Sequence, residues 1–79
     1  MRKIASVLVR EKFHLLVKFE NGIEKDIDLN PLLALPVFNA LNDPEIFGKV
    51  VNRIYFVEWE NQEIDLSADT IWHDGKTIN

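Results

Sequence analysis

The chain has 79 residues, of which 47% are apolar and 28% are charged, as expected for one small globular domain over residues 1–79. The absence of cysteine excludes disulfides, thiolate metal sites and a cysteine nucleophile, and no apolar run resembles a signal peptide or approaches the ~18 residues of a membrane span. Without either segment, we expect a cytoplasmic protein that binds no membrane. The formal net charge of −4 gives no general attraction for phosphate backbones, so we do not expect the isolated domain to bind nucleic acid.

The charges are divided unevenly along the chain. The first 18 residues contain the single acid Glu11 and five cations, Arg2, Lys3, Arg10, Lys12 and Lys18, whereas acids dominate the remainder. In a hairpin sheet we expect these cations to pair with the chain's own acids. Contact with an acidic partner is the alternative.

Two strands are predicted at the beginning of the chain. Residues 4–9 are rich in Val, Ile and Leu, and apolar residues then alternate with others over residues 13–20. The alternation places Leu15 on one face of the second strand and His14 and Leu16 on the other.

A return strand over residues 23–29 is predicted to follow a tight turn. A three-residue loop over residues 20–22 pairs Leu15 with Ile27 and keeps the apolar side chains on one face, which a two-residue turn does not. Such a loop favours a left-handed last residue, so we predict a positive φ at Gly22.

A helical segment is expected between the two hairpins. Asn30 as N-cap, followed by a proline, begins a short helix that Pro36 ends or kinks. Asp43, also followed by a proline, repeats this signal, and the pattern predicts a helix from there to about Val51.

The second hairpin is predicted to begin with a strand over residues 53–59. This strand is apolar on both faces, which indicates that it is central in its sheet or covered on both sides. A loop with an even number of residues pairs Trp59 with Ile64 and Val57 with Leu66.

The end of the chain is predicted to form one more helical turn. Residues 67–70 cap this turn, which carries Ile71 and Trp72, and Gly75 ends it. We expect the tail from Asp74 to be frayed.

Together these elements predict an α+β fold: a small sheet of about five strands, formed by two hairpins and an N-terminal strand, with a short helical segment between the hairpins. The chain also nearly repeats itself, since Phe19-Glu20-Asn21-Gly22 leads to Ile27-Asp28-Leu29 and Trp59-Glu60-Asn61-Gln62 leads to Ile64-Asp65-Leu66. Two hairpins that face one core converge on similar residues, so the repeat needs no duplication.

No motif in the sequence predicts catalytic, cofactor-binding or metal-binding residues. His14 and His73 lack the spacing of metal ligands, and no phosphate-binding glycine loop is present. Asp26 and Asp28 fall on the outward face of a strand, where solvated carboxylates are expected rather than a general acid and base. We expect a protein that is not an enzyme; an enzyme of unrecognised type is the alternative.

A partner surface is predicted on the second face of the sheet. If the helices cover the face that bears Phe19 and Trp59, the opposite face presents Leu16, Ile54 and Phe56 among charged residues. A contiguous apolar patch marks an interface, and a small domain gains stability from a partner that covers it. We expect this face, or an exposed edge strand, to bind another small protein or a second copy of the chain.

An ordered set of short motifs runs through nearly the whole chain: Phe19-Glu20-Asn21-Gly22 with Asp28-Leu29, Val37-Phe38 with Leu41 and Asp43-Pro44-Glu45-Ile46-Phe47, and Trp59-Glu60-Asn61 with Ile64-Asp65-Leu66. From about Ile4 to Trp72 this set resembles domain-of-unknown-function family 2442. The resemblance implies a small bacterial α+β domain with hairpins around a helical middle, and it supplies no catalytic residues. The chain departs from the family in its second turn, where Glu60 and Gln62 stand in place of the usual Pro and Gly.

The resemblance also implies two functions. Genes of short members look paired with that of another small protein of unknown function, which implies an antitoxin-like partner. Some relatives carry a helix-turn-helix after this domain. The alternative is therefore an accessory or regulatory domain of a DNA-binding system that lacks its helix-turn-helix.

Overall fold

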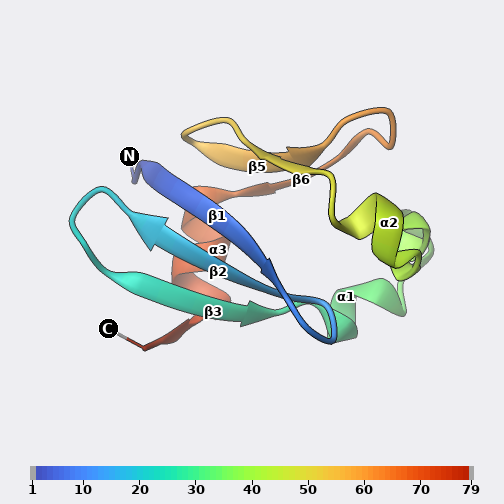
Figure 1. The fold of residues 1–79 in the computed structure, drawn as a ribbon, viewed down its shortest axis with the longest axis horizontal. Coiled ribbons are helices and arrows are strands. Elements are labelled where there is room, and N and C mark those ends of the chain that lie inside the picture. Colours follow the sequence, from blue (N-terminus) through green and yellow to red (C-terminus); the bar gives the residue numbers. More distant parts are fainter. Residues whose placement is uncertain (1, 79) are drawn as a thin grey trace.

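Two antiparallel sheets share one apolar core in the computed structural model, which describes residues 2–78 (Figure 1). The first sheet has the order β1 (Ile4–Arg10), β2 (His14–Phe19), β3 (Glu24–Asp28) and β7 (Lys76–Thr77), and the second has the order β4 (Val50–Asn52), β5 (Phe56–Trp59) and β6 (Ile64–Ser67). The helical elements are α1 (Asn30–Leu33), the 3-10 helix η1 (Pro36–Asn42), α2 (Pro44–Phe47) and α3 (Ala68–Asp74). The α+β prediction is confirmed. The predicted number of about five strands is roughly right, since β4 and β7 are short additions.

The turn of the first hairpin has the predicted three-residue loop. Gly22 has a φ of 91°, its N–H donates to the Phe19 carbonyl at 2.9 Å, and Phe19 N–H donates to the Ile23 carbonyl at 2.9 Å. Leu15 is paired with Ile27. The apolar side chains of β2 and β3 therefore share the inner face of the sheet.

The first helix begins one residue earlier than predicted. Leu29 is the N-cap of α1, and Asn30 is the first helical residue. The Asn30 side chain is engaged elsewhere, because its amide donates to the Lys12 carbonyl at 2.6 Å and to Asp28 Oδ1 at 2.7 Å. The prediction of Asn30 as N-cap is therefore wrong, whereas α1 does end before Pro36.

The second helix begins as predicted and ends early. Asp43 is the N-cap of α2, and its carboxylate accepts a hydrogen bond from Glu45 N–H at 2.9 Å. The predicted continuation to Val51 is wrong, because α2 ends at Phe47 and Val50 and Val51 form β4. These two β-branched residues pair with β5, where their side chains pack better than in a helix.

A tight turn shifts the start of β5 to a later residue than predicted. Tyr55 N–H donates to the Arg53 carbonyl at 2.8 Å, which makes a γ-turn around Ile54, whose φ is 71°. The strand therefore begins at Phe56 rather than at Arg53, and it is central between β4 and β6, as predicted.

The register of the second hairpin is also confirmed, since Trp59 pairs with Ile64 and Val57 with Leu66. This turn, over residues 60–63, contains neither proline nor glycine. Asn61 and Glu63 adopt positive φ values of 70° and 56° there.

The C-terminal tail is ordered by the first sheet. Ser67 caps α3 by accepting a hydrogen bond from Thr70 N–H at 3.1 Å, and Gly75 is its C-cap, as predicted. The prediction of a frayed tail is wrong for the described residues, because β7 pairs with β3 and Ile78 N–H donates to the Glu24 carbonyl at 3.0 Å.

Both sheets turn their apolar side chains toward one core. The buried strand residues include Leu15, Val17, Phe19 and Ile27 of the first sheet and Val57, Trp59, Ile64 and Leu66 of the second. Helix α3 lies behind β1–β3 in Figure 1, and its Trp72 packs edge-to-face on Phe19 with ring centroids 5.1 Å apart. Within residues 2–78, no helix covers the opposite face of this sheet (Figure 1).

Candidate functional site

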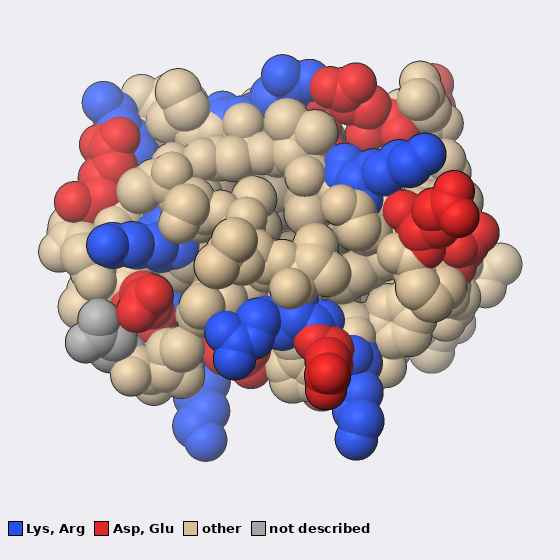
Figure 2. Space-filling view, viewed as in Figure 1, with Lys and Arg blue, Asp and Glu red and all other residues tan. Residues whose placement is uncertain are grey.

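The uncovered side of the first sheet is the candidate site, and we call it the outer face. Because successive residues of a strand point to opposite sides, the face can be read from the register once the buried residues of β2 are known. It consists of Ser6, Leu8 and Arg10 of β1, His14, Leu16 and Lys18 of β2, and Glu24, Asp26 and Asp28 of β3. Figure 2 shows this side of the molecule, with uncharged side chains in the middle and Lys, Arg, Asp and Glu around them.

An apolar pair lies at the centre of the outer face. Leu8 and Leu16 are directly opposite each other in the β1–β2 ladder, which brings their side chains into reach of one another. Leu8 is 56% exposed and Leu16 is half-buried. The pair therefore offers apolar surface to solvent in the middle of a polar sheet face.

The acids of β3 are engaged within the protein. His14 Nδ1 lies 2.9 Å from Asp26 Oδ2, and His14 Nε2 lies 3.6 Å from Asp28 Oδ1. Asp28 Oδ1 also accepts hydrogen bonds from the side chain of Asn30 at 2.7 Å and from its backbone N–H at 2.9 Å. These two bonds from Asn30, with a smaller contribution from His14, lower the pKa of Asp28 from its ordinary value of 3.8. Both ring nitrogens of His14 thus face carboxylates rather than a hydroxyl that it could activate.

The cations at the beginning of the chain do not follow the expected pairing. Arg2 forms an ion pair with Asp69 at 3.2 Å. Lys3, Arg10, Lys12 and Lys18 are exposed and belong to none of the ion pairs found among residues 2–78. The expectation is therefore wrong for these four residues, and on β3 the carboxylates of Asp26 and Asp28 are held by His14 and Asn30 instead.

A hollow of about 580 Å³ opens where β1 turns into β2. Its lining residues are Val9, Arg10, Glu11, Lys12, His14 and Asp26. Arg10 and His14 are opposite each other in the ladder and form the next pair on the outer face after Leu8 and Leu16. Basic side chains therefore stand next to the exposed apolar pair.

The three residues predicted to form the partner surface lie in different parts of the fold. Leu16 is on the outer face, whereas Ile54 is 48% exposed in the γ-turn and Phe56, half-buried, begins β5. Next to Phe56, Arg53 Nε donates to Glu58 at 2.6 Å and Arg53 also pairs with Glu60; the bond to Glu58 is the main cause that raises the pKa of Arg53.

Sequence reasoning missed Leu8. Residues 4–9 are almost uniformly apolar, so alternation along β1 gives no sign of which side faces solvent. The alternation along β2 assigns Leu16 to the outer face, and the residue paired with Leu16 in the β1–β2 ladder lies on the same face. That residue is Leu8.

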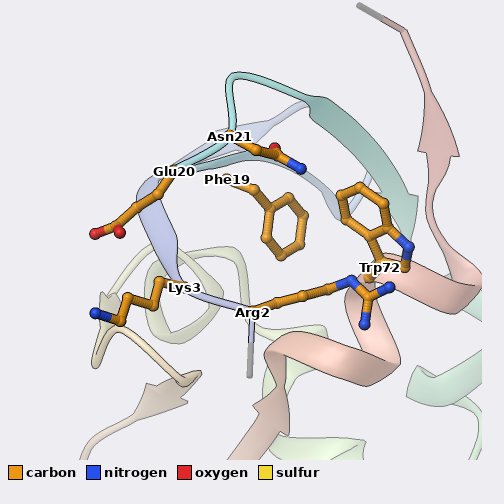
Figure 3. A pocket seen from close by; sticks show the side chains of 6 residues that line it. All are labelled: Arg2, Lys3, Phe19, Glu20, Asn21 and Trp72. Carbon is orange, nitrogen blue, oxygen red and sulfur yellow. The ribbon is translucent and has the colours of Figure 1, made fainter.

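A second cavity, of about 360 Å³, joins the first sheet to α3 and is shown in Figure 3. Phe19, Trp72 and Arg2 face this cavity, whereas Lys3 and Glu20 point away from it (Figure 3). The Arg2 guanidinium lies 4.4 Å and Lys25 Nζ 4.7 Å from the centroid of the Trp72 ring. These cation–π contacts hold α3 against the sheet, so Arg2, the charged residue that faces the cavity, is already used in the fold.

Fold and site together define a small α+β domain with an uncovered sheet face, apolar at its centre and charged at its margins. The family model described as "Protein of unknown function (DUF2442)" matches residues 4–77, and the chain belongs to this family. Neither the curated proteins nor the solved structures give a significant match. In residues 2–78, no helix is long and apolar enough to cross a membrane, and no group of three or more His, Asp or Glu side chains could hold a metal ion.

Proposed function

We propose that this DUF2442 protein is a non-enzymatic protein-binding module that pairs with another small protein, in the manner of an antitoxin with its partner. The observation that carries the proposal is the Leu8–Leu16 pair, exposed at the centre of a sheet face without a helix. We place the protein in the reducing cytoplasm, which suits a chain without cysteine.

The chemistry of the outer face favours binding over catalysis. His14, the histidine on this face, has its two nitrogens directed at Asp26 and Asp28, and this arrangement holds the ring in place without a nucleophile beside it. An exposed apolar centre within a polar margin is instead the composition of a recognition surface.

Capture of a partner by matched variants tests the proposal. Tagged wild-type protein, the double variant Leu8→Ser/Leu16→Ser and the control Val37→Ser are used to recover proteins from a lysate of the source organism, with quantification by mass spectrometry. Val37 is 72% exposed on η1, away from the outer face. We expect one small protein near 1:1 stoichiometry with the wild type and the control, and a loss of about tenfold with the double variant.

Two results would reject the proposal: equal recovery with the double variant, or recovery of the bait alone as a monomer. Circular dichroism of each variant establishes that the fold is retained. Ile54→Ser, tested in the same way, determines whether the γ-turn belongs to the partner surface together with Leu16.

A further inference from the structure

The charges of the outer face differ in whether they have partners within the protein. Asp26 and Asp28 are held by His14 and Asn30. Arg10 and Lys18 take part in none of the ion pairs or side-chain hydrogen bonds found for residues 2–78, although the chain as a whole carries a net charge of −4. Glu24, opposite Lys18 in the β2–β3 ladder, also has an interaction of its own. Arg10 and Lys18, the charged side chains of this face that form none of the ion pairs found for residues 2–78, are both positive.

The free cations lie on both sides of the apolar pair along the strand direction. Arg10 is two residues beyond Leu8 on β1, and Lys18 is two residues beyond Leu16 on β2. Because β1 and β2 are antiparallel, these steps run in opposite directions, and each covers roughly 7 Å. Cationic, apolar and cationic positions thus follow one another across the face.

The hollow beside Leu8 strengthens one end of this pattern. Arg10 and Lys12 both line it, together with Glu11 and with Asp26, whose carboxylate is held by His14. A carboxylate that enters the hollow meets a guanidinium and an ammonium that have no ion pair to break. Charge-assisted hydrogen bonds to such groups are stronger than those between neutral groups.

We infer that the partner binds through an acidic segment with an apolar anchor. The apolar side chain of this segment covers Leu8 and Leu16. A carboxylate two residues before the anchor reaches Arg10 and Lys12 at one end of the face, and a carboxylate two residues after it reaches Lys18 at the other end, or the reverse. The inference rests on the proposed function and names the chemistry of the partner. An extended segment of the pattern Glu-x-Leu-x-Glu has this spacing, because alternate residues of a strand face the same side.

Two model peptides test the inference directly. One repeats the pattern Glu-Thr-Leu-Thr-Glu and the other replaces each Glu with Lys; both have blocked ends. We expect the acidic peptide to shift the amide signals of outer-face residues of β1 and β2 in the NMR spectrum of the labelled protein, with a Kd of about 1 mM. Raising the salt from ~50 to ~300 mM should weaken this binding several-fold, since exposed charges are screened.

Charge reversal provides the matched variants. Arg10→Glu/Lys12→Glu should abolish the shifts caused by the acidic peptide. Lys49→Glu, a single charge reversal at an exposed lysine before β4, should leave them in place. Absence of shifts with the acidic peptide, or equal shifts with the basic one, would overturn the inference.

The two proposals can fail separately. If Leu8→Ser/Leu16→Ser loses the captured partner but Arg10→Glu/Lys12→Glu keeps it, the binding function stands and the acidic partner is wrong. Concentration-dependent shifts of the same amides without peptide would assign the face to a second copy. Equal shifts with duplex DNA would assign it to a nucleic acid. Either outcome overturns the inference.

Discussion

The indole N–H of Trp59 donates to the carbonyl oxygen of Phe47 at 2.8 Å, and this hydrogen bond ties the central strand of the second sheet to the last residue of α2. Trp59 is only 1% exposed, and its ring lies 5.9 Å from that of Phe47. Trp59→Phe would leave the Phe47 carbonyl without this donor and open space in the core. We expect a loss of about 2–3 kcal/mol in the free energy of unfolding, measured by urea denaturation.

Trp72→Phe serves as the control for this prediction. Trp72 is half-buried, and a phenyl ring can keep part of its contact with Phe19 and Arg2. A smaller loss, of about 1 kcal/mol, is therefore expected. Equal losses for the two variants would show that the buried hydrogen bond contributes little.

Ile54→Gly is expected to stabilise the protein. Ile54 is β-branched and has a φ of 71°, a conformation that costs most residues about 1–2 kcal/mol and glycine much less. About half of the side chain is exposed already, and the flexibility of glycine in the unfolded chain offsets part of the gain. A net gain of up to about 1 kcal/mol would raise Tm by about 4–8 °C.

Val37→Gly is the matched comparison for the γ-turn variant. Val37 is more exposed than Ile54 but lies in η1 and is not among the residues with positive φ. Glycine should destabilise this position by about 0.5–1 kcal/mol. If both variants lower Tm alike, the conformation of Ile54 stores no strain.

Asn30→Ala is expected to raise the pKa of Asp28 toward its ordinary value of 3.8, because the largest cause of the lowered pKa is the hydrogen bond from the Asn30 side chain. A group with a depressed pKa in the folded state stabilises the fold above its unfolded pKa, and this contribution disappears as pH falls through the folded pKa. The difference in stability between wild type and variant should therefore shrink below pH ~4.

An NMR titration of the Asp28 carboxyl carbon measures this pKa directly. Asn39→Ala removes a surface asparagine of η1, whose contact is with Asn42, and should leave the Asp28 titration unchanged. An unchanged midpoint in Asn30→Ala would rule out the hydrogen bond as the cause.

Gly75→Ala is expected to loosen β7. A Cβ at this position would lie 2.6 Å from the Ile71 carbonyl oxygen and 3.0 Å from Lys25 Cβ, so the backbone between α3 and β7 has to shift. Overpacking of this kind typically costs about 1–3 kcal/mol. Thermal unfolding followed by circular dichroism would report the loss.

Gly48→Ala provides the contrast. Its nearest neighbour would be the Pro44 carbonyl oxygen at 3.4 Å, close to ordinary contact. An alanine there should be neutral or stabilise by up to about 1 kcal/mol through the unfolded chain. A tolerated Gly75→Ala would argue that β7 pairs only weakly with β3.

The hairpins could be predicted from sequence because strand alternation and turn length together restrict the register. Gly22 and the buried residues of β2 leave one workable pairing with β3, and the same logic pairs Trp59 with Ile64. Local preference also found the cap at Asp43. These features depend on residues that are close together along the chain.

The predictions that failed depend on contacts between distant segments. The helix expected to reach Val51 ends early because β5 takes that residue into a ladder, and the side chain of Asn30 turns to Lys12 instead of capping its helix. The candidate site was found only in part for the same reason. Leu16 follows from alternation, whereas Leu8 is recognised once its strand partner is known.

The start of β1 is hydrogen-bonded to the end of β4 and to the γ-turn that follows it. Ile4 N–H donates to the Ile54 carbonyl at 2.7 Å, and the Asn52 side-chain amide donates to the Ile4 carbonyl at 3.0 Å. The second sheet therefore cannot open without releasing the first residue of the first sheet. We expect this linkage to couple the unfolding of the two sheets, so that the central amides of β2 and β5 exchange with solvent through the same global opening.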